Sequence, residues 1–367
     1  MSELVPTVDN ITHHETASIY ASFQHAAGQL AGLVAVDYFF AKEISQCMGF
    51  AQGTNNESAR QQWFHLLIAL SASLRDGHSC LPLTQVAGKQ GFIDAINQNK
   101  SNTKGFLFAD IKTLSALMTT LPLAALEKTP AAEPQPIVLS HQRLYLRRYY
   151  QFEQALKQVV RERRTIKVKP VASSVNSENS ASNVEAIKNI IASLFAELGQ
   201  QNEAVNSDVD WQAVAVANAM NKDFAIIAGG PGTGKTYTVT KLLAALLMLA
   251  SANNNNGEHF SPPKISLVAP TGKAAQRLSE SITAAVECFR SSIDGKILNL
   301  IPKTAQTIHR LLGVIPEQVN FRHHQENLLD IDILLIDEVS MVDLPMMTRI
   351  FRALPSHTKV ILLGDAD

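Results

Sequence analysis

A glycine-rich segment, "GGPGTGKT" from Gly229 to Thr236, holds the residues with the clearest chemistry. Its spacing fits G-x-x-x-x-G-K-[ST], in which the glycines let backbone N–H groups turn toward a phosphate chain. Lys235 can reach the β- and γ-phosphates of a nucleotide, and the Thr236 hydroxyl can ligate Mg²⁺. An apolar run precedes the segment and a helical pattern follows it. This context favours a phosphate-binding loop over a glycine turn without a ligand.

The nucleotide-binding prediction extends beyond the loop itself. Gln212 lies on a predicted helix just before the apolar run, and its amide offers adenine both a donor and an acceptor. Taken alone, an exposed helical glutamine is the simpler interpretation of this residue. The residues predicted to bind ATP are Gln212, Gly229, Gly230, Pro231, Gly232, Thr233, Gly234, Lys235, Thr236, Tyr237 and Asp365.

An acidic pair, Asp337 and Glu338, follows four consecutive apolar residues in "DILLIDEVSMVD". In phosphate-loop enzymes an acidic residue at such a strand end holds Mg²⁺, so Asp337 and Thr236 are the predicted magnesium ligands. Glu338 is placed to activate the attacking water as a general base. Solvated acids at a strand end are the alternative, but the phosphate loop about 100 residues upstream argues against it. The predicted catalytic residues are therefore Lys235, Asp337 and Glu338.

Two further stretches have the character of nucleic-acid contacts. In "APTGKAAQRLSESI", Thr271, Gly272 and Lys273 lie at a strand-to-helix turn, where backbone and ammonium donors can hold a phosphate. In "TAQTIHRLLG", Thr307, His309 and Arg310 lie on a short predicted helix. For His309 alone, a core-facing histidine without a role is the simpler interpretation.

The elements that must position these residues can be predicted from hydrophobic patterning. The apolar runs "FAIIA", "KISLVAP", "IDILLID" and "TKVILLGD" each indicate a buried strand, and helical stretches lie between them, as in a parallel α/β sheet. Helical spacing also covers residues 16–50, 56–75, 104–127 and 150–164, whereas "PIVLSHQRLYLRR" alternates like a strand pair. The Ser- and Asn-rich "PVASSVNSENSASNVEA" indicates a linker. We therefore predict a mostly helical domain over 1–165, a linker over 166–185 and an α/β nucleotide-binding domain over 186–367.

Composition sets the class of protein. The 367 residues are 46% hydrophobic and 18% charged, which indicates a folded chain, and the net charge of -1 shows no global basic excess toward nucleic acid. Cys47, Cys80 and Cys288 are widely spaced and odd in number, which fits a reducing compartment. No apolar stretch approaches the roughly 20 residues that cross a bilayer. We expect a cytoplasmic protein that does not contact a membrane, and we find no metal-ligand or nuclease-type cluster in the sequence.

The order of these motifs resembles the superfamily 1 DNA helicases: the glutamine, "GGPGTGKT", "APTGKAA", "TIHRLLG", "IDEVSMVD" and "LLGDAD". The resemblance is closest to the RecD family, the alpha subunits of exodeoxyribonuclease V. "FRHHQENLLDID", "DLPMMTRIFRALP", "GHSCLPL" and "RLYLRR" resemble that family too, so the likeness runs along nearly the whole chain. It is strongest over 208–367.

The resemblance implies a RecA-like motor domain and an ATP- and Mg²⁺-dependent helicase that steps 5′ to 3′ on DNA in repair and recombination. It also implies partners: single-stranded DNA and duplex ends, a RecB-type helicase–nuclease subunit and a RecC-type scaffold subunit. Thr271, Gly272, Lys273 and Thr307 match the family's DNA contacts. Two alternatives stay open, a nucleotide-binding assembly subunit that does not unwind DNA and another kind of P-loop ATPase.

The last residues, "LLGDAD", match the start of a helicase motif that continues in the family to a glutamine and then to a second RecA-like domain. On that basis we expect the chain to be a fragment of a longer motor or the product of an interrupted gene. Alone, it is expected to bind ATP, hydrolyse it slowly and not unwind DNA.

A basic stretch in the first half has two interpretations. From His141 to Pro170 the sequence has nine Lys or Arg against two Glu, and Tyr145, Tyr149 and Tyr150 are interleaved with arginines. Such a stretch can track phosphates and stack bases. A solvated helix or a face that docks a partner subunit is the favoured interpretation.

Overall fold

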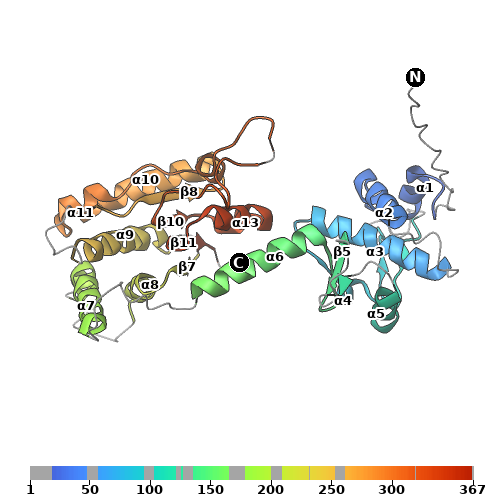
Figure 1. The fold of residues 1–367 in the computed structure, drawn as a ribbon, viewed down its shortest axis with the longest axis horizontal. Coiled ribbons are helices and arrows are strands. Elements are labelled where there is room, and N and C mark those ends of the chain that lie inside the picture. Colours follow the sequence, from blue (N-terminus) through green and yellow to red (C-terminus); the bar gives the residue numbers. More distant parts are fainter. Residues whose placement is uncertain are drawn as a thin grey trace, which may run out of the picture. The chain divides into compact units, whose positions relative to one another are not determined.

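The chain is described by a computed structural model. It describes residues 19–47, 57–94, 103–120, 125–126, 135–164, 178–199, 209–230, 232–252, 261–318 and 320–365. The chain divides into two compact units, Met1–Gln151 and Phe152–Asp367, which are described separately below (Figure 1).

The first unit is helical, as predicted, but it has more short strands than the predicted pair. Its helices are α1 (Phe23–Gln29), α2 (Ala35–Cys47), α3 (Glu57–Arg75), α4 (Leu83–Val86) and α5 (Ile111–Thr120). Its strands are β1 (Leu81–Pro82), β2 (Gln90–Gly91), β3 (Phe106–Leu107), β4 (Ala125–Leu126), β5 (Ile137–Ser140) and β6 (Arg143–Leu146). Strands β3 and β4 lie within the stretch 104–127, for which helical spacing was noted. The predicted strand pair is confirmed, because β5 and β6 pair antiparallel within a sheet of order β1-β6-β5-β4.

Helix α3 forms the centre of the first unit's core. Residues Trp63 to Leu70 are all buried, and Trp63 is fully enclosed. One polar residue lies among them: the His65 ring stacks on Phe106 with centroids 3.6 Å apart. Its Nδ1 lies 2.6 Å from the Gln61 carbonyl and its Nε2 lies 2.7 Å from the Tyr20 hydroxyl. Because a carbonyl only accepts, His65 donates from Nδ1 and accepts from Tyr20 at Nε2.

The second unit is an α/β domain. Its helices are α6 from Phe152 onward (full helix Arg147–Arg164), α7 (Glu178–Gly199), α8 (Trp211–Met220), α9 (Lys235–Ala252), α10 (Gly272–Cys288), α11 (Gly295–Leu300), α12 (Ile308–Leu312) and α13 (Leu344–Ala353). The short 3-10 helices η1 (Phe289–Ser291) and η2 (Val339–Met341) complete the helical set. Its strands are β7 (Phe224–Ala228), β8 (Ile265–Ala269), β9 (Gln306–Thr307), β10 (Ile333–Ile336) and β11 (Lys359–Gly364).

The five strands form one parallel sheet in the order β7-β11-β10-β8-β9. Successive residues of a strand point to opposite faces, and both faces are covered here. Ile333 and Leu335 of β10 enter a core with α7, α8, α9, α10 and α11, whereas Leu334 and Ile336 enter a core with α12 and α13. The predicted strands and the parallel α/β architecture are confirmed, and the arrangement is that of one RecA-like P-loop domain (Figure 1).

The boundary between the units lies earlier than the sequence analysis placed it. Residues 152–164 of α6, assigned there to the first domain, belong to the second unit because Leu156 and Val159 pack against the core beside α13. The last part of the predicted linker is helical, since α7 starts at Glu178. Residues 166–177 lie outside the described residues.

Candidate nucleotide and nucleic-acid site

The groups predicted to bind nucleotide, Mg²⁺ or DNA, apart from Gln212, lie at the carboxyl ends of the five parallel strands. The phosphate loop follows β7, Thr271 follows β8, Asp337 follows β10 and Asp365 follows β11, while Thr307 ends β9. Because parallel strands present their carboxyl ends at one edge of the sheet, these groups lie along a single edge. Ligands of open α/β sheets bind at that edge.

Two glycines of the phosphate loop, Gly232 and Gly234, have positive φ, and a third, Gly229, is closely packed. At Gly234, φ is +80° and an added Cβ would lie 2.9 Å from the Gln212 amide nitrogen. At Gly229, an added Cβ would lie 2.7 Å from the Thr233 hydroxyl oxygen. The loop then enters helix α9 at Lys235, so that the positive end of the helix faces the loop. Pro231 lies outside the described residues.

Lys235 is held by two groups at this edge. Its ammonium donates to the Gly229 carbonyl at 2.5 Å and forms an ion pair with the Asp365 carboxylate. Lys235 is largely covered, with 21% of its side chain exposed, whereas Asp365 has 45% exposed. The Lys235 ammonium is therefore already paired with the Asp365 carboxylate in this structure. A phosphate that binds Lys235 must compete with that carboxylate.

Gln212 reaches the phosphate loop directly. Helix α8 begins at Trp211 because the Asp210 carboxylate accepts from the backbone N–H groups of Gln212 and Ala213, which caps the helix. The Gln212 amide nitrogen then lies 3.4 Å from the Thr233 carbonyl oxygen. The side chain predicted to read adenine is thus next to the loop predicted to hold the phosphates.

Tyr237 lies one residue past the loop on α9. Its ring packs against Phe289 with centroids 4.5 Å apart and an interplanar angle of 53°. The Lys241 ammonium lies 5.0 Å from the Tyr237 ring centroid and 4.0 Å from that of Phe195. With 39% of its surface exposed, Tyr237 keeps an accessible aromatic face.

The acidic pair has strained backbone geometry. Glu338 has φ of +49°, a left-handed conformation that is uncommon for a residue with a side chain and that concentrates at functional sites. Its backbone N–H donates to the Asp337 carboxylate at 2.9 Å. Burial raises the pKa of Asp337, and the hydrogen bond from the Glu338 backbone N–H and the positive charge of Lys235 oppose that rise. The sequence did not indicate the strained turn at Glu338.

The residues present fit a magnesium site of the kind that depends on bound phosphate. Mg²⁺ is usually held by one or two protein groups together with substrate phosphates and water. Within the described part of the chain, the Thr236 hydroxyl makes no protein hydrogen bond, and no three His, Cys, Asp or Glu side chains gather as a protein-only metal site. Thr236 and Asp337 remain the proposed ligands.

The predicted DNA contacts are partly engaged in capping helices. The Thr271 hydroxyl oxygen accepts from Ala274 N–H at the start of α10, and the Thr307 hydroxyl oxygen accepts from Arg310 N–H at the start of α12. Each hydroxyl still has its own proton to donate. Gly272 and Lys273 form the exposed first turn of α10. Because α10 and α12 begin at the same edge of the sheet, both N-termini face the side where the nucleotide residues lie.

His309 is exposed, so the core-facing interpretation is wrong. Its ring meets Phe321 edge-on with centroids 5.9 Å apart, and the Arg349 guanidinium lies 5.3 Å from the centroid of the same Phe321 ring. The isolated pairing of Val314 with Phe321 brings this ring back beside α12. Phe321 and Arg349 were not among the predicted residues. Their contacts join positions that are far apart in the sequence, which motif spacing does not indicate.

The basic stretch of the first unit has mainly structural contacts. Tyr145 is 2% exposed and meets Tyr150 edge-on with centroids 5.5 Å apart. The Arg147 guanidinium donates to the Gln135 carbonyl, and its backbone N–H donates to the Pro136 carbonyl at 2.8 Å. Tyr145 is therefore not an open surface for base stacking. Docking of a partner subunit through this stretch, with Arg147 and Arg148 as the residues to test, stays a prediction.

Comparison with known proteins agrees with this architecture. Residues 29–145 match the family model described as the RecBCD enzyme subunit RecD N-terminal domain, and residues 212–367 match an AAA domain. RecBCD enzyme subunit RecD of Haemophilus influenzae is 47% identical over 158 residues, and that of Mycolicibacterium smegmatis is 40% identical over 157. The ATP-dependent RecD2 DNA helicase of Deinococcus radiodurans is 35% identical over 142 residues.

These matches cover part of each protein. The three alignments take in 42%, 42% and 39% of this chain, and 23%, 27% and 15% of the respective relatives. The chain thus matches about a quarter or less of the length of these curated relatives.

The fold and the carboxyl-edge residues define a P-loop domain of the superfamily 1 helicase type. With a RecD-type N-terminal domain before it, the chain is a RecD-like protein, and the resemblance noted in the sequence is confirmed. Among the described residues, no helix is both long and apolar enough to cross a membrane.

Proposed function

We propose that the second unit is the ATP-hydrolysing motor domain of a 5′-to-3′ DNA helicase that acts with RecB-type and RecC-type partners in double-strand break repair and recombination. The observation that carries the proposal is the convergence of five strand ends, with their functional residues, on one edge of the sheet. The names of the relatives, a RecBCD subunit and an ATP-dependent DNA helicase, support the assignment to DNA and to this complex. The protein is proposed to work in the cytoplasm.

The proposed roles at the ATP site follow from the chemistry of each group. Lys235 and the backbone N–H groups of the loop bind the β- and γ-phosphates. Thr236 and Asp337 hold Mg²⁺, which neutralises charge on the phosphates when it is bound. Glu338 accepts the proton of the attacking water. Gln212 orients adenine beside the loop, and Tyr237 offers an aromatic face near it.

The proposed DNA contacts lie at the N-termini of α10 and α12. Phosphate oxygens of one strand accept hydrogen bonds from the backbone N–H groups and hydroxyls at Thr271 and Thr307 and from the Lys273 ammonium. Such contacts bind the backbone without reading sequence, as a translocating motor requires.

The test is the ATPase rate of the purified chain, titrated with single-stranded DNA. Stimulation by DNA, lost in Lys235→Ala and in Glu338→Gln, is the expected result. Glu338→Gln should still bind nucleotide, because it removes the base and not a phosphate contact. Nucleotide binding without turnover would instead support an assembly subunit, and turnover that ignores DNA would support another kind of P-loop ATPase.

A further inference from the structure

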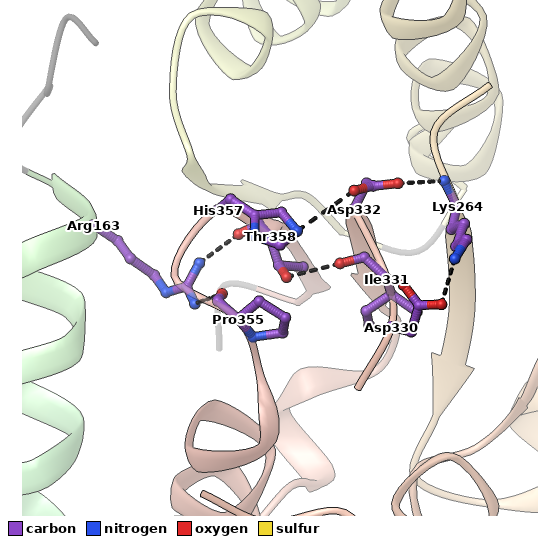
Figure 2. Close-up of polar contacts among 8 residues, drawn as sticks. All are labelled: Arg163, Lys264, Asp330, Ile331, Asp332, Pro355, His357 and Thr358. Atoms are coloured by element: carbon purple, nitrogen blue, oxygen red, sulfur yellow. Dashed lines mark hydrogen bonds and ion pairs between the residues drawn. The ribbon is translucent and has the colours of Figure 1, made fainter. Parts of the chain in front are cut away.

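A turn at the opposite edge of the sheet makes contacts with α6, with the end of α8 and with the residues just before β10. Residues Pro355 to Lys359 connect α13 to β11, and we refer to them as the β11 turn. Figure 2 shows that Arg163 from α6 points at the backbone of this turn, with His357 and Thr358 facing Asp332 and Ile331 on the other side. The turn lies at the amino ends of the strands, away from the proposed ATP site.

Arg163 fastens α6 to the β11 turn. Its guanidinium donates to the Pro355 carbonyl at 2.8 Å and to the Thr358 carbonyl, and lies 5.7 Å from the Phe351 ring centroid. Desolvation by burial lowers the pKa of Arg163, and the negative charges of Asp223 and Glu162 oppose the shift. An arginine fork that satisfies two carbonyls fixes the geometry of both acceptors.

Lys359 fastens the same turn to the end of α8. Its ammonium lies 3.1 Å from the Ala219 carbonyl and 3.2 Å from the Met220 carbonyl, and also donates to the Lys222 carbonyl. The Ala219 and Met220 carbonyls belong to the last residues of α8, where a cation is favoured by the helix dipole. Burial lowers the pKa of Lys359, and Asp223 opposes that shift as it does for Arg163.

The remaining contacts fix the turn within the sheet. Thr358, fully buried, donates from its hydroxyl to the Ile331 carbonyl at 2.9 Å. The Asp332 carboxylate accepts from the Lys264 backbone N–H at 2.8 Å and lies 3.5 Å from the His357 ring nitrogen. The amino ends of β8, β10 and β11 are thereby tied together (Figure 2).

Two elements that leave this edge reach the nucleotide residues at their other ends. Strand β11 runs from Lys359 to Gly364 and delivers Asp365 to Lys235. Helix α8, capped at its C-terminal end by Lys359, carries Gln212 at its N-terminal end beside the Thr233 carbonyl. A shift of the β11 turn would therefore move Gln212, which is proposed to orient adenine, relative to the phosphate loop. It would also move Asp365, which competes with phosphate for Lys235, so weaker binding would come through Gln212.

We propose that Arg163 and Lys359 are positioning residues for the nucleotide site, and that they act by setting the placement of β11 and α8. The inference rests on nucleotide binding at the proposed site, and the experiment below separates the two.

The experiment measures the equilibrium affinity of the full 367-residue chain for a fluorescent ADP analogue with Mg²⁺. We expect Arg163→Ala and Lys359→Met each to weaken binding by about threefold to tenfold, which lies within the range of about twofold to thirtyfold seen for mutations along coupled networks. Arg163→Lys, which retains the charge but not the fork, should fall between wild type and Arg163→Ala. Lys157→Ala is the matched control, since it removes an exposed cation from the same helix and should leave the affinity unchanged.

A second control separates positioning from stability. Leu156→Ala removes a core contact of α6 but none of the hydrogen bonds that hold the β11 turn. At a temperature where every variant is folded, it should keep wild-type affinity even though its Tm falls. Equal weakening in Leu156→Ala, or unchanged affinity in Arg163→Ala and Lys359→Met, would overturn the positioning proposal. Absence of binding by wild type would overturn the proposed function instead.

Discussion

At the scale of single residues, the ion pair between Lys235 and Asp365 has a consequence for nucleotide affinity. The ammonium must leave Asp365 before it can bind phosphate, so the carboxylate competes with the ligand. We expect Asp365→Asn to tighten ADP binding by about twofold to fivefold, because a partly exposed ion pair contributes up to about 1 kcal/mol. ADP is the suitable probe because it lacks the γ-phosphate. Its affinity therefore reports the competition for Lys235 without the additional contacts of a γ-phosphate.

The matched control for that measurement is Asp330→Asn. Asp330 also pairs with a lysine, Lys264, but at the opposite edge of the sheet and with 86% of its side chain exposed. It should not change ADP affinity. Weaker ADP binding by Asp365→Asn would show that the carboxylate supports the nucleotide instead of competing with it.

Alanine substitutions at Gly234 and Gly230 can be compared with each other, because the two glycines lie in the same phosphate loop but have different backbone conformations and surroundings. Alanine at Gly234 meets both a positive φ and the Gln212 amide at 2.9 Å, whereas a Cβ at Gly230 meets only the Thr233 methyl at 3.9 Å. The left-handed conformation alone costs an L-residue roughly 1–2 kcal/mol. We expect Gly234→Ala to weaken ADP binding about tenfold or more, and Gly230→Ala to change it by less than about threefold. Similar losses in both variants, measured by the same fluorescence titration, would contradict this account of the loop.

At the scale of elements, helix α3 makes the first unit sensitive to acid through His65. Burial lowers the folded-state pKa of His65 to about 4, against 6.5 for the free side chain. The unfolded chain therefore binds a proton first as the pH falls. Stability that is fully present above pH 6.5 should decrease by about 3 kcal/mol between pH 6.5 and 4.

Tryptophan fluorescence can follow this loss in the first unit alone. The chain has two tryptophans, Trp63 buried on α3 and Trp211 exposed in the second unit, so Trp211→Phe leaves one reporter in the first unit. Urea unfolding at several pH values should show the decrease, and His65→Gln should reduce its slope. A first unit whose stability does not vary over this range would refute the neutral, buried histidine.

How far the elements can be predicted from sequence depends on how local their signals are. Strands β7, β8, β10 and β11 are apolar runs ended by glycine, proline or acidic residues, so periodicity and turn chemistry identified them. Strand β9 has two residues and no such signal. The early start of α7 was missed because its first residues are Ser- and Asn-rich, a composition typical of linkers.

The residues of the site likewise divide into those with a local sequence signal and those brought together only by the fold. The spacing within "GGPGTGKT" and the acidic pair after β10 are local, and the sequence alone identified both. The pairing of Lys235 with Asp365 joins positions 130 residues apart, and that of Arg163 with Thr358 spans 195. Contacts of this kind depend on strand order, which a single sequence does not specify.

At the scale of the whole molecule, the boundary between the units can be tested by two fragments. A fragment of residues 152–367 keeps α6 against the core, whereas one of residues 165–367 loses Leu156, Val159 and the Arg163 fork. We expect the shorter fragment to be less stable by about 3 kcal/mol, roughly the burial energy of two partly covered apolar side chains. Urea denaturation compares them, and equal stabilities would return the boundary to the predicted linker.

The central claim is that the carboxyl edge of the five-stranded sheet is an ATP site built around Lys235. Calorimetric titration of the full chain with a slowly hydrolysed ATP analogue and Mg²⁺ tests it most directly. The account predicts binding of one nucleotide per chain and a loss of tenfold or more in Lys235→Ala, since hydrogen bonds to charged groups contribute about 1.5–3 kcal/mol each. Failure of the wild-type chain to bind, or equal binding by Lys235→Ala, would contradict it.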